Sequence, residues 1–129
     1  MVQDAERIGD FARGLIELVK RARSPRQGPF ADDLREIAKR LRPLFETCEQ
    51  AFREADPDEA RRVIAGHRML RRELKAYQER VASSDLTADM AVVYSGAAQI
   101  LRRIGAHLGN IASTVVQPYD KIRHGDDEN

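Results

Sequence analysis

Two carboxylates near the start of the chain have a spacing that suits cation binding. Glu6 and Asp10 lie four residues apart, so on a helix both occupy one face and repel each other by about 0.2–0.5 kcal/mol. A hard or borderline cation bound between them would relieve that repulsion. The neighbouring guanidinium groups of Arg7 and Arg13 would relieve it as well and leave an ordinary solvated surface. The spacing alone leaves both interpretations open.

Two histidines lie within helical patterns. His67 falls on an apolar stripe. A histidine there can act as a pH switch or a ligand, but more commonly it is a partly buried side chain that donates a hydrogen bond to a neighbouring helix. His107 precedes the core-facing Leu108, and we expect it to pack or hydrogen-bond between helices. Neither has a second histidine or cysteine at ligand spacing, so zinc catalysis is unsupported. No nucleophile pairs with a base, so we expect no enzyme.

The composition predicts one soluble domain. The 129 residues are 42% hydrophobic and 33% charged, and only 5% are aromatic, so the core must be aliphatic. A net charge of +1 gives no argument for nucleic acid or an anionic membrane as a partner. Cys48 is the only cysteine, which excludes an internal disulfide. No segment approaches the roughly 18 apolar residues of a membrane span.

Apolar residues that recur every three or four positions predict four helices and no strand. These helices span about residues 4–23, 30–55, 57–82 and 86–116. The second and third helices are joined so closely that they must be antiparallel neighbours. The predicted fold class is therefore all-α, as an up-down antiparallel bundle of four helices.

Proline and polar residues set the expected helix ends. Asp56 fits an N-cap and Pro57 the first position of the third helix. Ser83–Asp85 is expected to supply the next break and cap. Pro43 lies inside the second helix and should kink it there, and Pro118 should end the fourth helix.

The last two helices differ in their surfaces. The third is locally basic and could meet an acidic partner or headgroups, although a solvated charged face is more common. The fourth carries small residues along one side, and because glycine in a helix costs about 1 kcal/mol relative to alanine, they indicate close approach of another backbone. These small residues are Ala98, Gly105, Gly109 and Ala112.

A short segment occurs twice in the chain. Arg-Ile-Gly stands at residues 7–9 and again at 103–105, an offset of 96 counted from Arg7 to Arg103. Both copies lie in helical sequence, which suggests a duplicated helical unit whose first copy is mostly missing. The copies differ chemically, because the second has Arg102 and Ala106 at the positions of the two carboxylates.

These segments resemble a motif of the PhoU family of phosphate-signalling proteins. The last helix of each PhoU repeat carries a pattern close to Leu-Glu-Arg-Ile-Gly-Asp-His-Ala-x-Asn-Ile-Ala. The first copy matches over Glu6–Ala12, and the second at Leu101, Arg103–Gly105, His107 and Asn110–Ala112. The resemblance implies that residues 1–24 are the last helix of a preceding repeat and 30–122 a whole three-helix repeat, packed as one compact domain. Residues 123–129 are expected to form a disordered tail.

The resemblance also implies a function. PhoU-like domains are free cytoplasmic regulators of phosphate uptake or cytoplasmic domains of sodium/phosphate cotransporters, and they act through contact with transporter or sensor-kinase proteins. We therefore expect a cytoplasmic regulatory interaction domain, with no nucleic-acid partner and no direct membrane insertion. The oligomeric state stays open, and a homodimer is one option because a half-repeat leaves a spare helix. The alternative is a metal-binding bundle, because family members bind iron or zinc through carboxylates matched here by Glu6 and Asp10.

The second copy of the motif predicts different chemistry from the first. Because Arg102 replaces a family carboxylate, we hypothesise that its guanidinium supplies positive charge where the family places metal. It would pair with Glu6 or Asp10, or accept an anion. The remaining motif positions, Arg103, His107 and Asn110, are expected to contact an anion or another helix.

Overall fold

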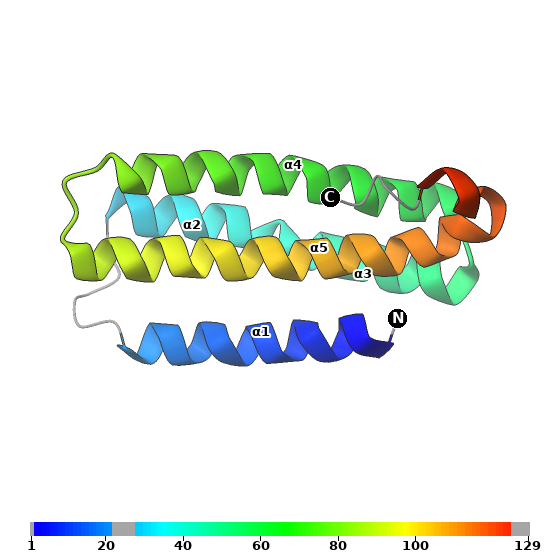
Figure 1. The fold of residues 1–129 in the computed structure, drawn as a ribbon, viewed down its shortest axis with the longest axis horizontal. Helices are drawn as coiled ribbons and strands as arrows, with labels where there is room; N and C mark the ends of the chain where they lie inside the picture. Colours follow the sequence, from blue (N-terminus) through cyan, green and yellow to red (C-terminus); the bar gives the residue numbers. More distant parts are fainter. Residues whose placement is uncertain (1, 22–27, 125–129) are drawn as a thin grey trace.

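The computed structural model describes residues 2–21 and 28–124, and every regular element within them is a helix. The helices lie side by side with nearly parallel axes, which confirms the all-α antiparallel bundle (Figure 1). Within the described residues no helix has the length and apolar character needed to span a membrane. The helices are α1 (Val2–Arg21), α2 (Pro29–Lys39), α3 (Leu41–Glu54), α4 (Pro57–Ala82) and α5 (Ala88–His124).

The predicted helix over 30–55 is divided in two at Arg40. Pro43 has no N–H to offer the carbonyl of Lys39, four positions earlier, and its ring clashes with that carbonyl. The regular ladder therefore stops before the proline, and the Arg40 N–H instead donates to the Ile37 carbonyl at 3.1 Å. The kink predicted at Pro43 lies three residues upstream, and Pro43 itself belongs to the first turn of α3.

The connection between α3 and α4 is as the sequence predicts. Ala55 adopts a left-handed conformation, with φ of 50°, and ends α3. The Asp56 carboxylate caps α4 by accepting hydrogen bonds from the backbone N–H groups of Asp58 and Glu59, at 3.0 and 3.3 Å. This tight turn makes α3 and α4 antiparallel neighbours.

The predicted break at Ser83–Asp85 is confirmed, because α4 ends at Ala82 with Ser83 as its C-cap. The predicted cap is wrong: the cap of α5 is Thr87, whose hydroxyl accepts from the Met90 N–H at 3.3 Å. At the other end α5 continues past Pro118 to His124, because an internal proline removes one hydrogen bond and bends a helix without necessarily ending it. The helix overlaps the first two residues of the predicted disordered tail, and 125–129 lie outside the described residues.

Helix α5 is the centre of the bundle and packs against all the other described helices, whereas α1 packs against α5 alone (Figure 1). The aliphatic seam between α4 and α5 is fully buried, and Ile104 is 5% exposed within it. Ile8 of α1 is half-buried against the same core. The core includes Val63, Leu70, Leu74, Tyr77, Leu101, Ile104 and Leu108.

Candidate functional site

The two copies of the duplicated segment face each other across the contact between α1 and α5. Near one end of the contact the Asn110 amide donates to Asp4, and near the other Gly14 lies beside Ile100, whose Cδ1 would be 3.9 Å from a Cβ on that glycine. The helices are therefore antiparallel.

The register of this contact is symmetric about two glycines. Asp4 precedes Gly9 by five residues, and its partner Asn110 follows Gly105 by five. In the same way Gly14 follows Gly9 by five residues, and its neighbour Ile100 precedes Gly105 by five. Gly9 thus lies opposite Gly105, and these are equivalent positions of the duplicated segment. An approximate two-fold axis relates the two copies.

A polar cluster holds the N-terminal end of α1 on α5. The Asp4 carboxylate contacts His107 Nδ1 at 2.7 Å and accepts from Asn110 Nδ2 at 3.4 Å. Phe11 stacks on the imidazole, with ring centroids 5.6 Å apart, and the Arg103 guanidinium lies 5.9 Å from the Phe11 ring centre. The motif residues of α5 therefore make contacts between helices.

The surroundings of Asp4 favour its ionised form. Burial is the largest single influence and by itself would raise the pKa of this carboxyl, but the hydrogen bonds from His107 and Asn110, together with the charge of His107, lower it on balance. Sequence reasoning missed Asp4. The signal was present, because Asp4 is seven residues from Phe11 and so shares the face of α1 that packs on α5.

We expect Asp4→Ala to destabilise the fold by about 1–2 kcal/mol, because His107 and Asn110 lose a partly buried acceptor. The matched substitution Glu6→Ala, on the exposed face of the same helix, should change stability by less than about 0.5 kcal/mol. Urea unfolding followed by circular dichroism measures both. Equal effects of the two substitutions would contradict a stabilising role for the cluster.

The predicted metal pair lies on the exposed face of α1. Glu6 and Asp10 are both exposed. Asp10 forms an ion pair with Arg13, so a neighbouring guanidinium relieves the repulsion between the two carboxylates, as in the second of the two interpretations of the sequence. Among residues 2–21 and 28–124 there is no group of three or more histidine, cysteine or carboxylate side chains that could hold a metal ion. Two carboxylates alone supply few of the six or more ligands of a hard cation.

Elemental analysis tests the metal interpretation directly. We expect protein purified without a chelator to contain no stoichiometric metal, and Glu6→Ala combined with Asp10→Ala to leave the metal content unchanged, because Arg13 already neutralises Asp10. Stoichiometric iron or zinc in the natural chain that disappears in the double variant would identify the pair as a metal site.

Arg102 does not pair with the carboxylates of α1. Its guanidinium donates to the Gln78 side chain of α4 at 2.8 Å and to Gln99 at 3.4 Å. The predicted ion pair with α1 is wrong because Arg102 is turned about 100° around α5 from Arg103 and about 140° from His107, which face α1. The structure thus separates Arg102 from the other motif residues.

His67 is buried between α4 and α5, with 7% of its surface exposed. The ring fills the space left by two glycines of α5: a Cβ on Gly105 would lie 3.2 Å from its Nδ1, and a Cβ on Gly109 3.1 Å from its Cδ2. Burial, with added repulsion from Arg71 and Arg68, lowers the pKa of His67 to about 4. The hydrogen bond expected from this histidine has no partner among the described residues.

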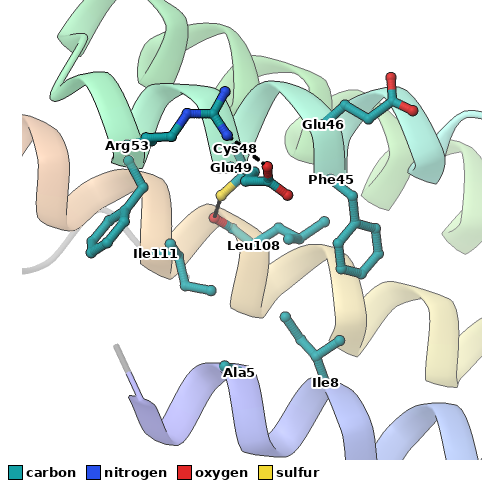
Figure 2. Close-up of a pocket in the computed structure, with 10 residues that line it drawn as sticks. Ala5, Ile8, Phe45, Glu46, Cys48, Glu49, Arg53, Leu108 and Ile111 are labelled. Atoms are coloured by element: carbon teal, nitrogen blue, oxygen red, sulfur yellow. Dashed lines mark hydrogen bonds and ion pairs between the residues drawn. The ribbon is translucent and has the colours of Figure 1, made fainter.

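An apolar groove runs between α1 and α3, with α5 as its floor (Figure 2). This α1–α3 groove has a volume of about 390 Å³. Phe45 of α3 points toward α1, and Ile8 of α1 points toward α3 (Figure 2). Phe45 and Phe52 are 40% and 47% exposed, which is high for phenylalanine. The other lining residues are Ala5, Glu46, Cys48, Glu49, Arg53, Leu108 and Ile111.

The floor and rim of the groove have internal partners. The Cys48 thiol donates to the Leu108 carbonyl at 3.6 Å, and burial raises the pKa of that thiol. Arg53 is paired with Glu49 at 2.9 Å on the rim. Apolar side chains therefore make up most of the groove lining, which suits binding of an apolar surface.

No protein-family model, curated protein or solved structure matches this chain.

Proposed function

We propose that this chain is a PhoU-like regulatory domain that controls phosphate uptake by contacting other proteins. One observation carries the proposal: the duplicated Arg-Ile-Gly segment lies on α1 and on α5, and the two copies pack with Gly9 opposite Gly105. Equivalent helices paired about an approximate two-fold axis are expected of a protein built from two related repeats. The partner is a phosphate transporter or a sensor kinase, reached in the cytoplasm by a free regulator or by a domain of a sodium/phosphate cotransporter.

The exposed face of α4 supports action by contact. Arg68 and Arg72 are exposed and have no ion-pair partner among the described residues, and Met69 between them is 58% exposed. A methionine adapts its shape to different apolar partners, and free guanidinium groups attract and orient acidic ones. This face of α4 suits a protein segment with acidic and apolar side chains.

A gene deletion tests the function itself. Cells that lack the gene should express a phosphate-starvation reporter in phosphate-rich medium, or take up phosphate at an altered rate, and the natural gene should restore both. A deletion that leaves reporter expression and uptake unchanged would contradict the proposal, since a regulator of phosphate uptake must alter at least one of them.

A charge reversal tests the contact surface. Arg68→Glu combined with Arg72→Glu should abolish complementation without unfolding the protein, because both side chains are exposed on α4. The matched control is Arg35→Glu with Lys39→Glu, an equally spaced and exposed pair on α2 whose ion pairs with Asp32 and Glu36 contribute little to stability. Equal loss of complementation in both variants would assign the effect to net charge and not to the α4 face.

A further inference from the structure

We propose that a second copy of this chain occupies the α1–α3 groove, so that two α1 helices pack antiparallel about a two-fold axis near Gly9. This assembly goes beyond the proposed regulation of phosphate uptake and does not depend on it. Helix α1 packs against α5 alone among the described helices. One flank of α1 therefore faces the open groove.

The duplicated segment indicates what that flank is suited to contact. An offset of 96 relates Ala5 and Ala12 of α1 to Leu101 and Leu108 of α5. The two leucines are 5% and 2% exposed in the bundle core, whereas both alanines are exposed. The flank of α1 keeps the apolar character of its counterpart on α5 but has no helix packed over it.

The side chains on this flank are small enough for another helix to approach closely. Gly9 lies between Ala5 and Ala12 on the same side of α1, and a Cβ on Gly9 would meet no atom within 4 Å. Two such helices placed antiparallel would bring the small residues of one against those of the other. Small residues alone can pack against many different helices, so the choice of a second copy as the partner depends on the charged residues beside them.

The charges beside the flank are self-complementary. Glu6 and Arg13 are seven residues apart and both exposed, so they lie on the same edge of α1 on either side of Gly9. In an antiparallel pair, Glu6 of each copy lies opposite Arg13 of the other. A two-fold interface requires this reciprocity. Glu6 has no partner among the described residues, and Arg13, paired with Asp10, can bridge both carboxylates.

The aromatic wall of the groove supplies the apolar contact. With α1 of the second copy in the groove, Phe45 and Phe52, now 40% and 47% exposed, would be covered. Aromatic side chains are enriched in the buried centres of protein interfaces. The same contact occurs twice by symmetry, so four phenylalanines leave water. The α1 helix of each copy then fills the groove of the other, which has a volume of about 390 Å³.

Analytical ultracentrifugation of the full chain over the micromolar range tests this assembly. We expect a reversible dimer, and we expect Ala12→Glu to weaken it at least about tenfold by placing an unpaired charge in the apolar contact. Ala65→Glu, the same substitution at an exposed position of α4, should leave the dimer intact. Thermal unfolding by circular dichroism confirms that both variants fold, since both alanines are exposed.

Disulfide trapping locates the axis. Gly9→Cys should form an intermolecular disulfide readily, because the two copies of this position meet at the proposed axis. Gln3→Cys, exposed on another side of α1, should form it slowly, and the natural chain with only the buried Cys48 should form none. A chain that stays monomeric, as expected if another protein fills the groove, would overturn the proposal. So would a dimer indifferent to Ala12→Glu, or equal trapping at both positions.

Discussion

Gly109→Val is expected to destabilise the fold by about 2 kcal/mol, although valine is the better helix former. The reason is His67, whose Cδ2 would lie 3.1 Å from a Cβ at position 109. The ring has little room to retreat, because only 7% of its surface is exposed and it already fills the space beside Gly105, where a Cβ would lie 3.2 Å from its Nδ1. Added methyl groups must therefore push apart α4 and α5, the two helices that form the buried seam.

Removing the ring should reverse this effect. In a His67→Ala background the space beside Gly109 is open, so the same Gly109→Val substitution should be nearly neutral or stabilising, because it fills a cavity and lowers helix flexibility. Urea unfolding of the four proteins of this double-mutant cycle should give a coupling energy of at least about 1 kcal/mol. Equal costs of Gly109→Val in both backgrounds would show that the glycine serves some purpose other than admitting the histidine.

The close approach at this seam was predictable from the sequence, and its occupant was not. Two glycines on one side of a long helix indicate that something comes near, because their cost must be offset. The periodic apolar stripes likewise predict the bundle, and Asp56 with Pro57 predicts the start of α4. Nothing in the pattern says that the neighbour is the ring of His67 and not a backbone.

The break at Arg40 shows why helix ends were predicted less well than helices. Apolar periodicity continues through residues 30–55 because α2 and α3 cover the same core, so it contains no sign of an interruption. Pro43 gives the sign, but its steric conflict is with the carbonyl of Lys39, one turn earlier. In α5 the proline does not end the helix, which continues beyond Pro118 to His124.

The sequence predicted several residues of the candidate site but not the side chains that they contact. The motif residues His107 and Asn110 were expected to contact an anion or another helix, and the group they bind is the carboxylate of Asp4, which lies outside the motif. Spacing along one helix fixes which side chains share a face. It does not fix the rotation of a second helix, 100 residues away in the chain, against that face. For the same reason Arg102 was expected near α1 and instead contacts Gln78 of α4.

Acidification is expected to destabilise the protein between about pH 6.5 and pH 4 through His67. Its pKa in the fold is lowered to about 4 from the ordinary 6.5, so in this range the unfolded chain binds a proton that the folded one does not. Stability is complete above pH 6.5 and declines as the pH falls toward the folded pKa. The loss is about 2 kcal/mol at pH 5 and about 3 kcal/mol at pH 4, a large part of a typical small domain's stability.

Comparison with His67→Leu isolates this contribution, since leucine keeps most of the side-chain volume and does not titrate. The difference in unfolding free energy between the natural chain and the variant should change by about 2 kcal/mol from pH 7 to pH 5. Asp4 does not interfere, because its pKa is lowered from 3.8 and its stabilisation is lost only below that value. A pH-independent difference would mean that the imidazole can be protonated in place, and that the seam between α4 and α5 opens to water more readily than its packing suggests.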